Sequence, residues 1–246
     1  SFDKNLKELN QDLELTVDLN LQYLIREELI KFQKIFNNIG SAAILMNSKN
    51  GEILSLLSLP DYDLTKRQLL EDKNLINRAT KGVYELGSVF KTFTYAAGLN
   101  EGYIEPDTEF KNLKKKIWCS KFSIGEYDNK IPSDLTAEQI LIRSGNIGSV
   151  RIAQKIGPEK FKSFLQKVGI LSQITFDIEE VAPQKSYEFG KCKLATASYG
   201  HGIATTILQL AKGYAILSNG GFEINPTLIN KNSKKNTKRN RLLNKG

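Results

Sequence analysis

Apolar residues recur every three or four positions in several stretches of the chain, which is the spacing of one helix face. The first such stretch, residues 21–36, predicts an amphipathic helix that Asp18 or Asn20 caps and Gly40 closes. Ahead of it, alternating apolar and polar residues at 13–17 predict a short strand. The chain therefore begins with a strand and a helix in this prediction.

Two strands are predicted on either side of Asn50-Gly51, a dipeptide that strongly favours a tight turn between paired strands. They cover residues 41–46 and 52–57, and Pro60 ends the second strand. The sequence therefore predicts an N-terminal β-hairpin after the first helix.

The remainder of the chain is predicted to be rich in helix. Capping boxes begin at Thr136 and Thr206, each followed three positions later by Gln. The predicted helices after the hairpin cover residues 88–102, 136–143, 147–157, 161–168 and 206–219. Residues 61–82 and 106–132 have a polar, loop-like pattern, and residues 170–195 give no assignable one. The pattern as a whole indicates an α+β fold.

Length and composition are those of a soluble globular protein. The chain has 246 residues, of which 40% are hydrophobic and 25% charged, enough for one large domain or two small ones. No run approaches the roughly 18 apolar residues of a membrane span. Residues 1–4 lack the basic start and apolar centre of a signal peptide. We therefore expect any membrane anchor or export signal to lie outside this chain.

The net charge of +8 is concentrated at one end of the chain. Residues 230–246 contain seven basic residues and no acidic one, whereas the rest contains 28 basic and 27 acidic residues. We expect 230–246 to be a solvated, poorly ordered segment, and a nucleic-acid or anionic-lipid patch is the alternative. No recognisable RNA or DNA motif accompanies the charge, so no nucleic-acid partner is predicted.

Several kinds of site are disfavoured by the residues present. Cys119 and Cys192 lack C-x-x-C spacing and have no histidine cluster nearby, so neither a metal nor another cofactor is predicted. His201 is the only histidine, and its place between two glycines favours a role in the loop backbone over a Ser-His-Asp triad. Residues 82–87 have the glycine spacing of a P-loop, but Ser88 and the valine after it stand where Lys and Ser/Thr are required.

Ser88 and Lys91 are the strongest candidates for chemistry. Gly87 allows a sharp turn, and the residues that follow are apolar on nearly every side, as in a helix buried in a core. Because residues three apart share a helix face, Lys91 would accept the Ser88 proton if burial lowers the lysine pKa. The Ser88 backbone N–H would point outward at the helix start, available to an oxyanion.

A second polar cluster, Ser144-Gly145-Asn146, lies in the predicted break between two helices. A hydroxyl and an amide two positions apart in such a turn can point to one side. Ser144 would then relay a proton, and Asn146 would hold a peptide-like substrate. The alternative is a turn that needs these residues for its backbone alone.

Together, residues 84–91 and 144–146 resemble the first two active-site motifs of penicillin-binding proteins, Ser-x-x-Lys and Ser-x-Asn. Flanking segments agree with this family at residues 15–22, 77–79, 146–148, 199–203, 209–211 and 219–221. The resemblance extends to about Pro226 and is to the monofunctional class-B enzymes, the peptidoglycan D,D-transpeptidases of the cell-division type.

The resemblance implies an α+β fold shared with serine β-lactamases and an acylation mechanism. Ser88 would attack the penultimate D-alanine of a stem pentapeptide with Lys91 as its base, leaving an acyl-enzyme. Ser144 would pass the proton to the leaving amine, and Asn146 would hold the substrate's peptide amide and the lysine. β-Lactams would acylate the same serine.

The resemblance also implies partners and a location. Stem peptides, on a lipid-linked precursor or on nascent glycan, would be the substrates, and divisome proteins the partners. The catalytic domain would lie in the bacterial periplasm, with its inner-membrane anchor outside this chain. Neither a cofactor nor a metal is implied.

Two departures from the family pattern shape these expectations. Leu86 and Val89 stand where the family usually has proline and threonine, and no Lys-Thr-Gly or Lys-Ser-Gly third motif occurs. We therefore expect residues 1–246 to be a partial, inactive transpeptidase domain, cut at both ends and missing the C-terminal sheet strands. The alternatives are an inactive stem-peptide-binding or divisome scaffold, and a serine β-lactamase, although no group that would activate a deacylating water is identified.

Overall fold

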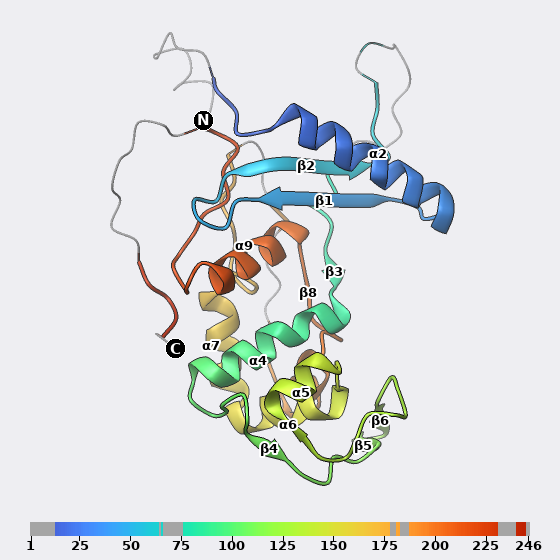
Figure 1. Ribbon diagram of the computed structural model, residues 1–246, viewed down its shortest axis with the longest axis vertical. Coiled ribbons are helices and arrows are strands. Elements are labelled where there is room, and N and C mark those ends of the chain that lie inside the picture. Colours follow the sequence, from blue (N-terminus) through green and yellow to red (C-terminus); the bar gives the residue numbers. More distant parts are fainter. Residues whose placement is uncertain are drawn as a thin grey trace.

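The computed structural model describes residues 13–63, 65, 76–177, 181–182, 187–230 and 240–244. Figure 1 shows a two-stranded hairpin crossed by one long helix, above a group of shorter helices. The predicted α+β class, with an N-terminal hairpin and a helix-rich remainder, is confirmed.

The helices are α2 (Leu19–Phe36), α4 (Lys91–Asn100), α5 (Ala137–Ile142), α6 (Asn146–Ile156), α7 (Pro158–Lys167), α8 (Lys191–Ala197) and α9 (Ile207–Ser218). The strands are β1 (Ser41–Met46), β2 (Ile53–Leu59), β3 (Tyr84–Glu85), β4 (Glu109–Phe110), β5 (Lys116–Cys119), β6 (Phe122–Gly125), β7 (Leu135–Thr136) and β8 (Ala204–Thr205). They pair antiparallel as β1 with β2, β3 with β8, β4 with β7 and β5 with β6.

The N-terminal hairpin forms as predicted, and its second strand extends to Leu59, the residue before Pro60. Every second residue of β2 is buried, which is the period expected when one face of a strand packs on a core. Figure 1 shows α2 crossing the hairpin on one side and α9 lying on the other. The hairpin is thus the layer between these two helices.

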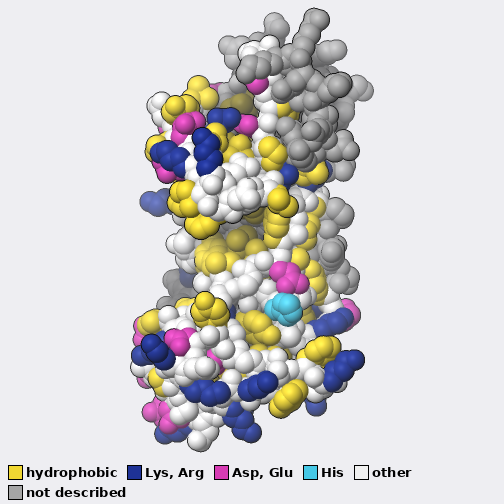
Figure 2. All heavy atoms as spheres, turned by 90° about the vertical axis from the view of Figure 1, so that its right-hand side faces the viewer, with side chains coloured by type: hydrophobic (Ala, Val, Ile, Leu, Met, Phe, Trp, Pro, Cys, Tyr) yellow, Lys and Arg dark blue, Asp and Glu magenta, His cyan; other side chains and the backbone are white. Residues whose placement is uncertain are grey.

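Helix α2 begins where the sequence predicts, because the Asp18 carboxylate accepts hydrogen bonds from the Asn20 and Leu21 amides. No α2 side chain is buried among the described residues, and Leu19 and Ile35 are 80% and 70% exposed. The amphipathic pattern therefore predicts the helix correctly, although its apolar side chains are only half-buried or exposed. Figure 2 shows hydrophobic side chains at the surface in the upper part of the molecule, where α2 lies.

The strand predicted at 13–17 does not form. Leu15 makes only an isolated bridge to Ile229. The Thr16 amide donates a hydrogen bond to the Leu228 carbonyl, and two residues later the Asp18 amide donates to the Leu54 carbonyl. The segment contacts two different neighbours in succession, so it never pairs continuously with one strand.

Helix α4 lies at the centre of the helical layer. Phe90 and Phe93 are fully buried, and Phe90 packs edge-on against Phe161 of α7. A methyl group on Gly98 would lie 2.8 Å from the Ile104 side chain, so the close packing of α4 requires glycine there. The prediction of a core helix after Gly87 is confirmed.

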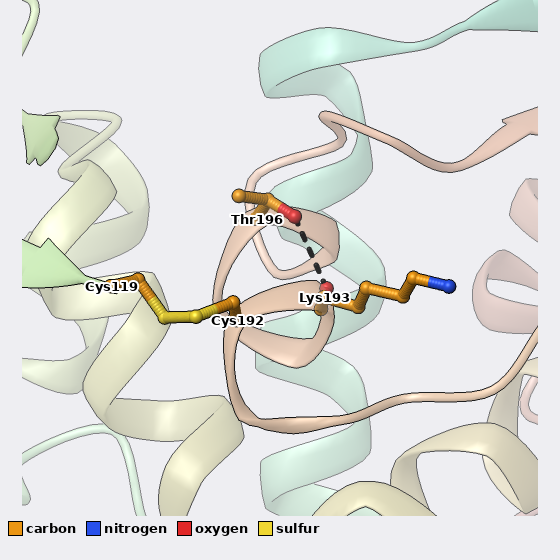
Figure 3. The surroundings of a disulfide bond; sticks show 4 residues. All are labelled: Cys119, Cys192, Lys193 and Thr196. Atoms are coloured by element: carbon orange, nitrogen blue, oxygen red, sulfur yellow. Dashed lines mark hydrogen bonds between the residues drawn. A yellow bond between two sulfur atoms is a disulfide. The ribbon is translucent and has the colours of Figure 1, made fainter. Parts of the chain in front are cut away.

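The loop-like prediction for 106–132 is wrong in part, because this stretch contains β4 and the β5–β6 hairpin. Each strand of that hairpin has only four residues, and lysines interrupt its apolar pattern. Ile124 is its one buried residue, opposite Ile117. A disulfide joins Cys119 of β5 to Cys192 of α8, with the Cα atoms 5.4 Å apart (Figure 3).

The other predicted helices are present with shifted ends. Both capping boxes form, at Thr136 and Thr206. Helix α6 begins at Asn146, and α7 begins at Pro158 because proline is favoured in a first helical turn. Helix α8 falls at the end of the stretch 170–195 that the sequence pattern leaves unassigned.

Parts of three predicted segments lie outside the described residues. They are 64 and 66–75 of the polar stretch, 178–180 and 183–186 of the unassigned stretch, and 231–239 and 245–246 of the basic segment. Of that basic segment, the described Arg241 forms a bridge with Phe222. Across the described residues, none of the helices has the length and apolar character needed to cross a membrane.

Candidate active site

Ser88 lies on a 3₁₀ turn, Gly87–Phe90, that leads directly into α4. The Lys91 amide donates to the Ser88 carbonyl across this turn. Ser88 therefore precedes the α-helix instead of lying in its first turn. Its side chain is exposed, whereas Lys91 is 3% exposed.

The backbone beside Ser88 is held by the segment that contains β8. Strand β3 pairs with β8, and the Gly87 amide donates to the Gly200 carbonyl at 3.1 Å. Gly200 has φ +81°, and a Cβ there would lie 2.0 Å from the Gly87 carbonyl oxygen. Glycine is therefore required at position 200, and this contact sets the position of Ser88.

The structure brings the two candidate motifs together. Lys91 Nζ donates to the Ser144 carbonyl oxygen at 2.5 Å and to Ser144 Oγ at 2.9 Å. Ser144 has φ +53°, an unfavourable backbone conformation for a residue with a side chain. The turn thus presents both Ser144 oxygens to the lysine.

Burial lowers the pKa of Lys91 to about 8, and the nearby negative charge of Glu126 partly opposes this effect. An ordinary lysine has a pKa above 10. A substantial fraction of Lys91 is therefore neutral in mildly alkaline solution, which a proton acceptor requires.

Asn146 is the first residue of α6, and its Nδ2 donates to the Gly125 carbonyl at 2.8 Å. Among the described residues no hydrogen bond joins Asn146 to Lys91, whose Nζ bonds Ser144 instead. The structure thus places Asn146 two residues from Ser144, with its side chain anchored to β6.

Sequence reasoning missed Glu126. Its carboxylate accepts hydrogen bonds from the Asn146 amide at 2.7 Å and the Ile147 amide at 2.9 Å. An isolated acidic residue some twenty positions earlier, in a stretch with a loop-like pattern, gives no signal that it contacts this helix start.

His201 lies, as expected, at a backbone-shaped position, because Gly200 and Gly202 on either side have positive φ. Its Nδ1 is 3.0 Å from a carboxylate oxygen of Glu85, and both side chains are exposed. The described residues contain no cluster of three or more His, Cys, Asp or Glu side chains that would hold a metal.

An exposed serine, a buried lysine three residues later and a second serine bonded to that lysine are the residue types that serine acyl transfer uses. Residues 41–245 match the family described as the penicillin-binding protein transpeptidase domain, so the chain belongs to this family. The resemblance drawn from the two motifs is confirmed.

Curated relatives agree. The chain is 30% identical over 219 residues to a probable peptidoglycan D,D-transpeptidase FtsI of Caulobacter vibrioides, covering 89% of this chain and 37% of the relative. It is 28% identical over 214 residues to a probable peptidoglycan D,D-transpeptidase PenA of Neisseria flavescens, covering 86% of this chain and 52% of the relative. The chain thus spans between about a third and a half of the length of these relatives.

Solved structures share the fold. The transpeptidase domain of Burkholderia pseudomallei penicillin-binding protein 3 superposes with a TM-score of 0.81 at 24% identity, covering 95% of this chain and 66% of that one. Penicillin-binding protein 3 of Mycobacterium tuberculosis, complexed with aztreonam, superposes with a TM-score of 0.79 at 23% identity. The match covers 88% of this chain and 49% of that one.

Proposed function

We propose that the protein containing this domain is a peptidoglycan D,D-transpeptidase that works through a Ser88 acyl-enzyme. The observation that supports this most is the pair of hydrogen bonds that Lys91 donates to Ser144. Lys91 is buried and lies three residues after the exposed Ser88. Family membership and the relatives named D,D-transpeptidases support the same reaction.

In the first step, Ser88 Oγ attacks the carbonyl of the penultimate D-alanine of a stem peptide. Neutral Lys91 accepts the serine proton, and burial supplies that neutral form by lowering the lysine pKa to about 8. Ser144 passes a proton to the nitrogen of the terminal D-alanine. The peptide bond breaks, D-alanine leaves, and the stem remains as an ester on Ser88.

In the second step, an amine of a neighbouring stem attacks this ester and forms the cross-link. Ser88 recovers its proton, so the protein ends unchanged. Asn146 holds the peptide amide of the donor stem. A β-lactam, whose ring amide resembles the donor peptide bond, acylates the same serine, and the aztreonam complex of the Mycobacterium tuberculosis relative supports this part of the proposal.

We also propose that the domain works in the bacterial periplasm, anchored in the inner membrane, with divisome proteins as partners. The relative named FtsI supports the division role. The Cys119–Cys192 disulfide supports the location, because disulfides persist in oxidising compartments such as the periplasm.

Labelling of the full-length protein with a fluorescent penicillin tests the proposal. We expect the wild type to be labelled and Ser88→Ala to lose all label. Ser163→Ala is the matched control, since Ser163 is an exposed serine on α7 that belongs to neither motif. Label that persists in Ser88→Ala would contradict the proposal.

Nitrocefin hydrolysis separates the alternatives. A transpeptidase gives one stoichiometric burst followed by slow turnover, because its acyl-enzyme resists water. Sustained turnover would identify a serine β-lactamase. No burst and no penicillin labelling would identify a scaffold that binds stem peptides without cross-linking them.

A further inference from the structure

Glu126 reaches the active site from the end of the β5–β6 hairpin, outside both motifs. We propose that Glu126 is a positioning residue, which holds the first turn of α6 and with it Ser144 and Asn146 in the arrangement that acyl transfer requires. This inference rests on the proposed function for its catalytic consequence, although its structural part is testable separately.

The contact between the hairpin and α6 is made by two adjacent residues. Both carboxylate oxygens of Glu126 accept backbone amides, from Asn146 and Ile147, and the Gly125 carbonyl accepts the Asn146 side-chain amide. Each of these three bonds is 2.9 Å or shorter. Backbone and side chain of Asn146 are therefore fixed by the same end of the hairpin.

No residue at the start of α6 caps the helix with its own side chain, so a distant residue has to accept its first amides. The residue at its N-cap is Gly145, which has no side chain to accept the first amides of the helix. A carboxylate at a helix N-terminus is also favoured by the helix dipole. Glu126 thus supplies from a distant segment the cap that most helices obtain locally.

The same cap fixes the partner of Lys91. Ser144 lies two residues before Asn146, and both of its oxygens accept from Lys91 Nζ. A shift of the α6 start would therefore move Ser144 away from the lysine. In addition, the negative charge of Glu126 raises the pKa of Lys91 against the larger effect of burial, and Tyr95 is a further titratable residue beside the lysine.

The hairpin itself is tied to the helical layer. Figure 3 shows the disulfide joining β5, through Cys119, to α8, through Cys192. Helix α8 in turn packs against α6. Glu126 follows directly after β6. The β5–β6 hairpin that carries this carboxylate is therefore held to α8 through the disulfide on β5.

Acylation rates of the full-length protein by a fluorescent penicillin test the catalytic part. We expect Glu126→Gln, which removes the charge and one acceptor, to acylate about 10-fold to 100-fold more slowly. Asp128→Asn is the matched control, because Asp128 lies on the same loop and its side chain, among the described residues, accepts a hydrogen bond only from the nearby Lys130 amide. We expect this control to acylate at the wild-type rate.

A double variant tests whether a cap on the first turn of α6 is what acylation requires. A side chain at position 145 has room, since a Cβ there would lie no closer than 3.7 Å to its neighbours. In Glu126→Gln/Gly145→Ser the new hydroxyl caps α6 locally. We expect it to recover much of the acylation rate, while the lysine still lacks the nearby carboxylate charge.

Titration of Lys91 by NMR on isotope-labelled lysine gives a readout independent of catalysis. We expect the midpoint in Glu126→Gln and in the double variant to fall below the wild-type value of about 8, and Asp128→Asn to leave it unchanged. The pH–acylation profile should move in the same direction.

Two outcomes separate the two proposals. If Ser88→Ala is labelled like the wild type, the proposed function fails, but the lysine titration and the amide signals of Asn146 and Ile147 still test Glu126. If Glu126→Gln is folded, acylates at the wild-type rate and leaves both amide signals and the Lys91 midpoint unchanged, the positioning role is overturned. Should Glu126→Gln not fold, the double variant gives the decision, since a folded double variant that acylates more than about 100-fold more slowly than the wild type would also overturn the positioning role.

Discussion

Lys91 combines burial with a proton-accepting task, and this combination makes the site sensitive to pH. Burial lowers its pKa to about 8, so protonated lysine predominates below that pH and neutral lysine above it. We expect acylation of Ser88 by benzylpenicillin to rise with pH, with a midpoint near 8, and to level off in more alkaline solution. A rate that is flat or falls between pH 6 and 9 would exclude Lys91 as the base.

Ser144 contributes a hydroxyl that its own backbone cannot replace. In Ser144→Ala the lysine keeps the carbonyl partner but loses Oγ at 2.9 Å, and with it the route for a proton to the leaving group. We expect acylation to slow by roughly 10²-fold to 10⁴-fold with little loss of stability. Rapid-quench labelling measures this rate, and a fall of less than threefold would argue against a relay.

The candidate residues differ in how far the sequence reveals them. Ser88, Lys91 and Ser144 belong to short motifs that are weak evidence singly, and the resemblance of both motifs together to one family singles these residues out. The contact between the two motifs depends on the tertiary fold, and the Lys91–Ser144 bonds show it. Glu126 has no motif, because its role depends on where a distant hairpin ends.

At the scale of elements, the sequence predicts what local interactions determine. Capping boxes and the Asn50-Gly51 turn act within a few residues, and the structure confirms the helices and hairpin they predict. The β5–β6 hairpin has no comparable local signal. It depends on burial of Ile124 and on a disulfide whose cysteines are 73 positions apart.

The contact between Gly87 and Gly200 makes a prediction about the segment that presents the nucleophile. Gly200→Ala places a methyl group against the Gly87 backbone, whereas Gly157→Ala has the same φ of +81° and no atom within 4 Å. Gly157 has ψ 162°, a region that is essentially restricted to glycine, so we expect Gly157→Ala to cost about 1–3 kcal/mol from backbone strain alone. Gly200→Ala should cost at least about 1 kcal/mol more, because overpacking is added to the strain.

Urea unfolding measures both variants, and penicillin labelling measures the effect on Ser88. Only Gly200→Ala should slow the labelling, because only that methyl group displaces the turn before the serine. Equal stability and equal labelling of the two variants would show that the close approach of these backbones is not important.

At the scale of the whole molecule, one covalent link closes a long loop through the helical layer. The Cys119–Cys192 disulfide joins positions 73 residues apart, and such a link restricts the unfolded chain considerably. We expect reduction, or Cys119→Ser, to lower the free energy of unfolding by roughly 2–5 kcal/mol. Urea unfolding with and without reductant measures the difference.

The cysteine variant provides its own control. Cys119→Ser should unfold at the same urea concentration with or without reductant, close to that of the reduced wild type. A wild type whose unfolding is unaffected by complete reduction would contradict a stabilising disulfide.

The proposed function requires Ser88 to form a covalent bond with a β-lactam carbonyl. The most direct measurement is mass spectrometry of the full-length protein after reaction with benzylpenicillin, followed by peptide mapping. We predict a mass increase of one penicillin per chain, located on the peptide that contains Ser88 and absent from Ser88→Ala. A protein that gains no mass, or gains it on a peptide without Ser88, would contradict the account.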